Sequence, residues 1–172
     1  MAQDDLVIDP WGSAQSTDYD RIIEQFGLTS MTGVSLSNPS KLHRRGIVFA
    51  HRDVDQVVEA QRTGSPFGVL TGLMPSGQMH LGHSMVVEQA RWFQENGGDV
   101  TIAVADLESQ ATRGVSLSKG REVALREYIA HYAALGLDAE KTNVYFQSRR
   151  PIVLRLCFIL VKRTKVTELE SI

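Results

Sequence analysis

After residue 66, short apolar runs alternate with segments in which apolar positions recur at helical spacing. Short, continuous apolar runs predict buried strands of a parallel sheet, and they lie at residues 67–71, 100–105 and 143–146. Apolar positions at helical spacing predict helices at residues 82–96, 119–135 and 151–164. Strand and helix therefore alternate three times, which predicts an α/β fold. We expect the first half of a Rossmann-like parallel sheet, with right-handed crossovers and helices on both faces.

The pattern before residue 66 is shorter and less regular. It predicts a strand at residues 6–12, a helix at residues 19–26 capped by Asp18, a strand at residues 47–50, and a helix that Asp53 caps and that ends near Arg62. Residues 29–40 are rich in Ser, Thr, Gly, Asn and Pro and are expected to form a loop. We therefore predict a small α+β extension at residues 1–65, followed by a partial Rossmann-like domain at residues 66–172.

The junction between the first strand and the first helix of this second part carries a cluster of polar residues. From Pro75 to His83 it reads Pro-Ser-Gly-Gln-Met-His-Leu-Gly-His. The first turn of a helix presents free amide N–H groups and a partial positive charge, so it can bind anions. His80 and His83 share a helix face, from which both imidazoles could donate to phosphate oxygens. Gly82 leaves room for a flat ligand to approach the backbone. The turn is a candidate nucleotide site.

Two other interpretations of this turn remain open. Ser76 or Gln78 could cap the helix without any ligand. The two histidines could hold zinc, although the sequence suggests no third ligand nearby. The position of the turn favours a nucleotide, because ligands of Rossmann-like sheets bind where parallel strands end. Residues 105–113, expected to form a loop, follow the next strand and reach the same crevice.

Composition narrows the class of protein. A hydrophobic content of 42% and a charged content of 22% are typical of a globular domain, and the net charge of −2 does not indicate nucleic acid. No apolar run approaches the length of about 18 residues that spans a membrane. Cys157 is the only cysteine and no leader pattern begins the chain, which together favour the cytoplasm. The basic segment at residues 149–172 is interpreted as a solvated helix face rather than a nucleic-acid patch.

The turn resembles the His-Ile-Gly-His signature of class I aminoacyl-tRNA synthetases. The matching stretch consists of Pro75, Ser76, Gly77, Gln78, Met79, His80, Leu81, Gly82 and His83, with Leu81 in place of Ile. Three further segments resemble tryptophanyl-tRNA synthetases of the archaeal and eukaryotic type: Asp-Pro-Trp at residues 9–11, Asp-Tyr-Asp at 18–20, and Arg-Arg-Gly-Ile-Val-Phe-Ala-His-Arg-Asp at 44–53. The resemblance extends from about residue 7 to residue 172.

The resemblance implies a tryptophan–tRNA ligase that works in two steps. The carboxylate of tryptophan attacks the α-phosphate of ATP and releases pyrophosphate, and the tryptophanyl group then passes to the terminal adenosine of tRNA. The implied cofactor is ATP with Mg2+, the implied partners are tryptophan and tRNA, and the full-length family forms homodimers. His80 and His83 are the implied catalytic residues. The implied ATP-binding residues are Thr71, Gly72, Pro75, Ser76, Gly77 and Gly82.

The sequence departs from the family pattern around the amino-acid pocket. Leu70 stands where relatives carry an aromatic residue, and Leu-Met at residues 73–74 stands where they often carry Arg-Gly. The second strand ends in Ala-Val-Ala-Asp, at residues 103–106, where a glutamine is common. Asp106 or Glu108 could pair with the ammonium group of the amino acid, or both could be solvated loop residues. The Ala-Asp-Leu stretch there also resembles tyrosyl-tRNA synthetases, which are the alternative within the class.

The second signature of the family, Lys-Met-Ser-Lys-Ser, is absent from the sequence. Leu-Ser-Lys-Gly at residues 117–120 is similar, but Ser118 is better interpreted as the cap of a helix that begins at residue 119. Without the second signature or an anticodon-binding domain, the chain is expected to be truncated at its C-terminus. Two alternatives to an active ligase therefore stand. One is a non-catalytic module that binds ATP or tRNA, and the other is a fragment without function that exposes a sheet edge.

Overall fold

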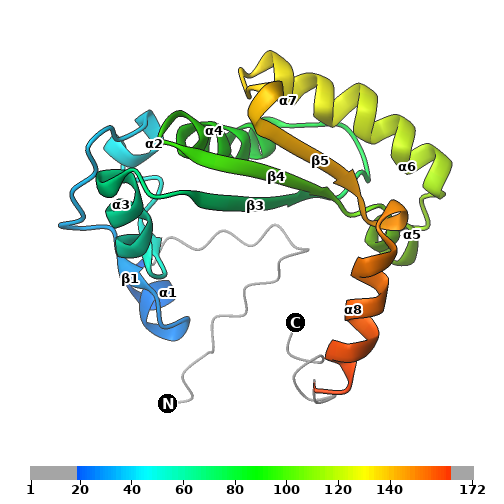
Figure 1. The fold of residues 1–172 in the computed structure, drawn as a ribbon, viewed down its shortest axis with the longest axis horizontal. Coiled ribbons are helices and arrows are strands. Elements are labelled where there is room, and N and C mark those ends of the chain that lie inside the picture. Colours follow the sequence, from blue (N-terminus) through cyan, green and yellow to red (C-terminus); the bar gives the residue numbers. More distant parts are fainter. Residues whose placement is uncertain (1–18, 164–172) are drawn as a thin grey trace. The chain divides into compact units, whose positions relative to one another are not determined.

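The computed structural model describes residues 19–163, which fall into two compact units that divide between Ser65 and Pro66 (Figure 1). Several sequence predictions lie outside the described residues. They are the strand at residues 6–12, the Asp18 cap and the Asp-Pro-Trp segment. The assignment of residues 1–65 as an extension and of residues 66–172 as a partial catalytic domain stays a prediction.

The first unit contains three short helices and a two-stranded sheet. The helices are α1 (Tyr19–Gln25), α2 (Lys41–Arg44) and α3 (Val54–Thr63), and the strands are β1 (Thr29–Ser30) and β2 (Ala50–His51). The strands pair antiparallel, with Ser30 opposite Ala50. The segment expected to be a loop therefore begins with a short strand, and the strand expected at residues 47–50 is shorter and lies later.

The start of α3 is capped differently from the prediction. Asp53 occupies the N-cap position, but its side chain makes no capping hydrogen bond and its φ angle of 53° is left-handed. His51 Nδ1 instead accepts a hydrogen bond from the Val54 amide at 3.3 Å. The expectation that Asp53 caps this helix through its side chain is therefore wrong, because an imidazole two residues earlier takes the role.

The second unit contains the predicted parallel sheet. Its strands are β3 (Phe67–Leu73), β4 (Gly98–Val104) and β5 (Thr142–Phe146), in the order β3-β4-β5. Val69 lies opposite Val100, and Val100 lies opposite Thr142. The helical segments are α4 (Leu81–Glu95), α5 (Asp106–Arg113), α6 (Leu117–Val123), the π-helix η1 (Ala124–Ile129), α7 (Ala130–Ala134), the short 3-10 turns η2 (Ala139–Lys141) and η3 (Gln147–Arg149), and α8 (Pro151–Val161).

The helices that connect the strands cover one face of the sheet. Figure 1 shows α4 and the long helix from α6 to α7 on the same side of β3, β4 and β5. The core on this side contains Leu73, Val87, Ala90, Val100, Ile102, Val104, Ala124, Tyr128, Tyr132 and Leu137. This arrangement differs from the expectation of helices on both faces. Because the strand order advances in one direction, two right-handed crossovers place both helices on the same face.

Two local predictions after β4 need correction. Residues 105–113, expected to form a loop, contain α5, which has Asp106 and Glu108 in its first turn and ends at Gly114 in the left-handed conformation (φ 65°). Acidic residues stabilise the first turn of a helix, and glycine tolerates the left-handed C-terminal position. The next helix begins at Leu117 and is capped by Ser116, whose hydroxyl accepts from the Lys119 amide at 3.3 Å. The cap expected at Ser118 is therefore wrong by two residues.

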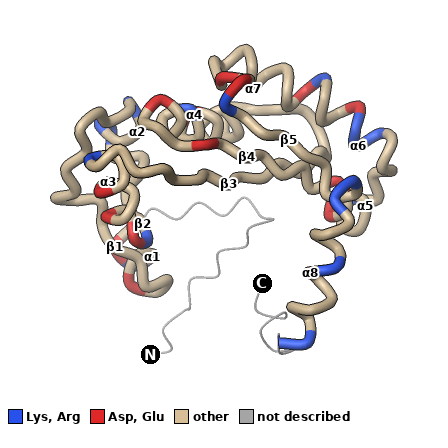
Figure 2. Tube along the Cα trace, in the orientation of Figure 1, with Lys and Arg blue, Asp and Glu red and all other residues tan. Residues whose placement is uncertain are grey.

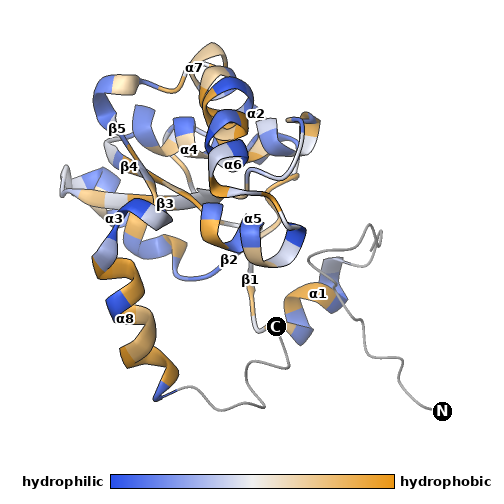
Figure 3. Cartoon of the chain, turned by 90° about the vertical axis from the view of Figure 1, so that its right-hand side faces the viewer, coloured by the Kyte–Doolittle hydropathy of each residue, from blue (hydrophilic) through white to orange (hydrophobic). Residues whose placement is uncertain are grey.

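Helix α8 is strongly apolar yet exposed (Figure 3). The side chain of Phe158 is 79% exposed, and none of the residues of α8 is buried. Cys157 is exposed on this helix, although a lone cysteine in an apolar run is usually an inert core residue. At 11 residues α8 is too short to cross a bilayer, and no other helix among residues 19–163 combines the length and apolarity that a membrane span needs.

Candidate functional site

The two histidines of the turn cap helix α4 reciprocally. His80 is the N-cap residue, and its Nδ1 accepts from the Gly82 amide at 3.2 Å. His83 Nδ1 accepts from the His80 amide, also at 3.2 Å. The helix is therefore capped by His80 rather than by Ser76 or Gln78. Because both Nδ1 atoms accept hydrogen bonds, each neutral imidazole carries its proton on Nε2 and can donate from there.

The two imidazole rings lie close together, with centroids 3.9 Å apart and planes inclined by 49°. Burial, together with the electrostatic influence of His80, lowers the pKa of His83 below its usual value. The lowered pKa favours the neutral form of His83, whose Nε2–H is a hydrogen-bond donor. This pair stands at the start of a 15-residue helix, where free amides and the helix dipole favour an anion.

The His80 ring lies close to the Gly82 backbone. A Cβ atom at this position would lie 3.1 Å from His80 Cε1 and 3.2 Å from its Nδ1. A side chain at residue 82 would therefore require the His80 ring to shift by a few tenths of an ångström. The sequence argument for Gly82 invoked room for a ligand, and the structure adds an internal reason for the same residue.

The other predicted ATP-site residues gather around the same strand end. Thr71 and Gly72 lie on β3, and Ser76 and Gly77 are exposed in the turn. Pro75 differs from them because its side chain is fully buried. Pro75 therefore shapes the turn from inside, while Ser76 and Gly77 present the turn to solvent.

A cavity of about 540 Å³ opens at the carboxyl ends of β4 and β5. Its lining consists of Asp106, Leu117, Ser118, Arg121, Phe146, Ser148 and Arg149. Figure 2 shows acidic residues of α5 beside basic residues at the junction between β5 and α8. The cavity therefore combines a carboxylate, two guanidinium groups and an aromatic ring, with the Arg121 guanidinium carbon 5.4 Å from the centre of the Phe146 ring.

Asp106 is buried in the wall of this cavity, with only 2% of its surface exposed. Its carboxylate accepts hydrogen bonds from the Leu107 amide at 3.1 Å and from both the amide and the hydroxyl of Ser148. Glu108 lies on the same helical turn, is half-buried and does not line the cavity. Of the two carboxylates predicted to bind an amino acid, Asp106 is the one that the structure brings to a cavity.

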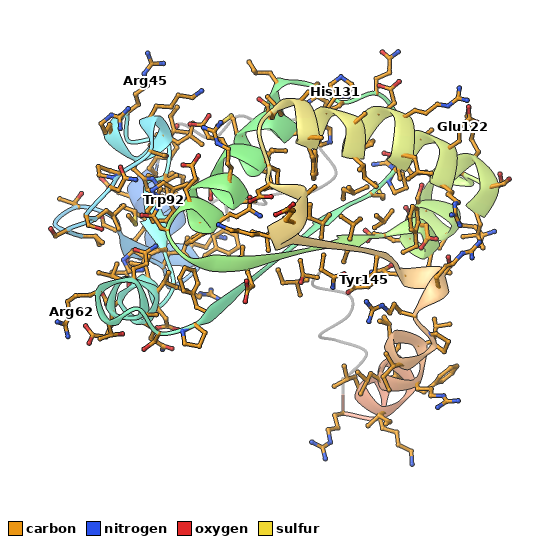
Figure 4. All side chains as sticks on the ribbon, turned by 45° about the horizontal axis from the view of Figure 1, so that its top comes forward. Arg45, Arg62, Trp92, Glu122, His131 and Tyr145 are labelled. Atoms are coloured by element: carbon orange, nitrogen blue, oxygen red, sulfur yellow. The ribbon has the colours of Figure 1, made fainter. Side chains whose placement is uncertain are left out.

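Sequence reasoning missed the contribution of the third strand. Ser148 and Arg149 follow β5 and line the cavity. The neighbouring Arg150 lies over the ring of Tyr145, 5.0 Å from its centre; Tyr145 is labelled in Figure 4. The rule that ligands bind at the carboxyl ends of parallel strands applies to β5 as well as to β3 and β4. Extending it to the residues after the third strand would have found Ser148 and Arg149.

Within residues 19–163, no group of three or more His, Cys, Asp or Glu side chains is arranged to hold a metal ion. The histidine pair has no third protein ligand in that range.

Comparison with models of protein families matches residues 62–172 to the family of class I tRNA synthetases (W and Y). The chain belongs to this family of tRNA synthetases. The match contains both the histidine turn and the cavity after β4 and β5, so the site described above lies within the part of the chain that defines the membership.

Individual relatives within the class I synthetases support the same family assignment. The chain is 41% identical over 98% of its length to a protein of Methanosarcina acetivorans named tryptophan–tRNA ligase, and it spans 39% of that protein. It is also 41% identical to the tryptophan–tRNA ligase of Methanocaldococcus jannaschii, of which it spans 46%. The crystal structure of tryptophanyl-tRNA synthetase from Aeropyrum pernix superposes with a TM-score of 0.83 at 41% identity, over 96% of this chain and 47% of that one.

The chain therefore spans less than half the length of the curated relatives to which it is similar. The Rossmann-like parallel sheet is confirmed by the superposition, and the resemblance to synthetases of the archaeal type is confirmed by the relatives.

Proposed function

We propose that this chain provides the ATP half-site of a tryptophan–tRNA ligase. The observation that carries the proposal is the geometry of His80 and His83 at the start of α4. Two adjacent imidazoles accept backbone amides through Nδ1, so both Nε2–H groups are donors at the end of a helix that favours anions. Phosphate oxygens of ATP are the ligands that match this arrangement.

In the proposed reaction, a carboxylate oxygen of tryptophan attacks the α-phosphorus of ATP. The bond between the α-phosphorus and the bridging oxygen breaks, and pyrophosphate leaves. Negative charge moves onto the leaving group, where donors such as His80 and His83 stabilise it. Thr71, Gly72, Ser76, Gly77 and Gly82 surround the adenylate, with Pro75 shaping the turn beneath them. Mg2+ would accompany the phosphates of bound ATP and would neutralise part of their charge.

The cavity after β4 and β5 is the proposed position of the amino acid. Phe146 and Leu117 provide apolar contact for an indole ring, and Asp106 provides a buried negative charge for an ammonium group. Glu108, on the same helical turn, is the second candidate for the ammonium group. The basic side chains of Arg121 and Arg149 are suited to the carboxylate of the amino acid.

The experiment is ATP–pyrophosphate exchange on the 172-residue chain, with tryptophan and tyrosine compared as substrates and ATP binding measured in parallel. Exchange with tryptophan is the outcome expected if the half-site can complete amino-acid activation. Exchange with tyrosine alone would assign the chain to the tyrosine branch of the family. Binding of ATP without exchange would identify a non-catalytic module, and the absence of ATP binding would remove the proposal altogether.

Binding of tRNA, transfer of the tryptophanyl group and dimerisation are further parts of this proposal, and each needs its own test. The relatives are named as tRNA ligases, but this chain spans 39% to 46% of their lengths. Addition of the purified cognate tRNA to the exchange assay, followed by measurement of charged tRNA, tests the transfer step. Sedimentation of the chain over a range of concentrations tests dimerisation.

A further inference from the structure

The turn that leads to His80 and His83 packs against buried residues of the helices that follow β4. Ser109 on α5 is completely buried, and its hydroxyl donates a hydrogen bond to the Pro75 carbonyl at 3.1 Å. Gly120 on α6 is also buried, and a Cβ atom at this position would lie 3.6 Å from Pro75 Cγ. The turn is therefore supported by segments that lie 34 or more residues later in the sequence.

A second buried contact comes from Tyr128. This side chain is 1% exposed, and burial raises the pKa of its phenol, while hydrogen bonding with the Gly77 amide and the Ser76 side chain, in the exposed part of the turn, lowers it. The ring of Tyr128 also meets the ring of His83 edge-on, with centroids 5.3 Å apart and planes at 90°. One side chain thus contacts both the loop part and the histidine part of the proposed ATP site.

The segment that carries Tyr128 has an unusual backbone. Residues Ala124–Ile129 form a π-helix that joins α6 to α7 within one long helix. Single π-helical turns are rare and occur frequently at functional sites. Here the π-helix lies where the long helix presents Tyr128 to the turn, while Ala124 and Tyr132 on the same side pack into the core.

We propose that Tyr128 is a positioning residue for ATP binding: its hydroxyl fixes Ser76 and Gly77 in the turn, and its ring fixes the orientation of His83. Ser109 supports the same turn at Pro75. Tyr128 touches the reacting groups only through these residues, so it is not a catalytic residue. The inference rests on the proposed ATP site, but the contacts that it describes exist without ATP and can be tested separately.

The first test measures amide hydrogen exchange in the absence of ATP. Tyr128→Phe removes the hydroxyl and keeps the ring, and Tyr132→Phe, one helical turn later and also buried, is the matched control. Loss of a hydrogen bond is expected to accelerate exchange of the Gly77 amide by about 3- to 10-fold relative to the core amide of Ile102 in Tyr128→Phe, and to leave this ratio unchanged in Tyr132→Phe. A purely structural role of Tyr128 would accelerate both amides together and leave the ratio unchanged.

The second test measures the dissociation constant of ATP for the same variants. Tyr128→Phe is expected to weaken ATP binding by about 3- to 10-fold, and Tyr132→Phe by less than about 2-fold. Equal ATP affinity and an equal Gly77 exchange ratio in Tyr128→Phe and the wild type would overturn the role of Tyr128, while the ATP site would stand. Failure of the wild type to bind ATP would overturn the proposed function, and the exchange ratio would still decide whether Tyr128 holds the turn.

Ser109→Ala provides an independent variant if Tyr128→Phe does not fold. This substitution removes the hydrogen bond to the Pro75 carbonyl, so it should accelerate exchange of Gly77 relative to Ile102 and weaken ATP binding in the same direction. Unchanged exchange and unchanged affinity in a folded Ser109→Ala protein would contradict support of the turn from the α5 side.

Discussion

The carboxylate of Asp106 accepts hydrogen bonds from both the amide and the hydroxyl of Ser148. The amide nitrogen lies 3.0 Å from Oδ1, and Asp106 is 2% exposed. A buried acid at the start of α5 therefore holds the chain where it leaves β5, and it closes one wall of the cavity. This contact joins two of the residues that line the cavity.

Replacement of Asp106 by Ala should lower the free energy of unfolding by about 1–3 kcal/mol, because it leaves the two part-buried donors of Ser148 without this acceptor. Urea denaturation of the wild type and the variant measures the difference. Asp99→Ala is the matched control, since Asp99 is an exposed carboxylate on the preceding strand and its loss should change stability by less than about 0.5 kcal/mol. Equal urea midpoints for Asp106→Ala and Asp99→Ala would contradict the structural role of the contact.

Two glycines at the start of the parallel sheet should respond oppositely to substitution by alanine. A Cβ atom at Gly98 would lie 2.8 Å from the Phe67 ring and 3.0 Å from both the Phe93 carbonyl and Val69 Cγ2. Gly98→Ala should therefore destabilise the fold by about 1–3 kcal/mol, because a buried site without space must rearrange. Thermal unfolding monitored by circular dichroism is the measurement.

Gly68→Ala is the control for this prediction. Gly68 lies on the neighbouring strand β3, and a Cβ atom there would have no atom within 4 Å. We expect this variant to unfold at the wild-type temperature or slightly above it, because alanine restricts the unfolded chain more than glycine does. A Gly98→Ala protein as stable as Gly68→Ala would show that the contacts around Gly98 are looser than described.

His83→Ala should weaken ATP binding by about 10- to 100-fold, because it removes a donor to a charged phosphate group. His51→Ala should leave ATP affinity nearly unchanged, although it should destabilise the chain by about 1 kcal/mol through loss of the cap on α3. Titration of ATP at saturating Mg2+ measures both effects. Equal affinities for the wild type and His83→Ala would remove His83 from the site.

The sequence was informative wherever structure depends on neighbours along the chain. The strand β4 and the polar turn that ends at His83 can both be recognised from a few consecutive residues of the sequence. Helix α5 was not predicted because it has few apolar positions. Its acidic first turn and the glycine at residue 114 do indicate where a helix begins and ends. The contact from Tyr128 to Gly77 joins residues 51 positions apart, and no periodicity in a single sequence encodes such a pairing.

The face of the sheet on which the helices pack could not be deduced from the sequence alone. Alternation of strands and helices predicts parallel strands, but the face that each helix covers depends on the order of strands in space. In this sheet the order β3-β4-β5 places α4 and the α6–α7 helix together, and it leaves Leu70, with 71% of its surface exposed, on the opposite face. Strand order is a tertiary property, so it had to come from the structure.

The pKa of His83 should lie below its ordinary value of 6.5 in the folded chain and should rise when ATP binds. Burial disfavours the charged imidazolium in the free protein, so the unfolded chain takes up the proton first as the pH falls below 6.5. Stability from this group is therefore complete above pH 6.5 and declines as the pH falls towards the lower folded pKa. Burial lowers the pKa of His43 in the same direction, so only the part of the decline that is lost in His83→Gln belongs to His83.

Phosphate charge acts in the opposite direction, because an anion beside the ring stabilises the imidazolium. By linkage, ATP that raises the pKa of His83 must bind more tightly as the pH falls from about 7.5 to about 6. NMR titration of the His83 Cε1 proton, with and without ATP, measures the shift directly. Adenosine is the matched control ligand, since it lacks phosphate and should leave the pKa of His83 unchanged. A shift of equal size with adenosine would show that the nucleoside rather than the phosphates lies against His83, and the direction of ATP in the site would have to be reversed.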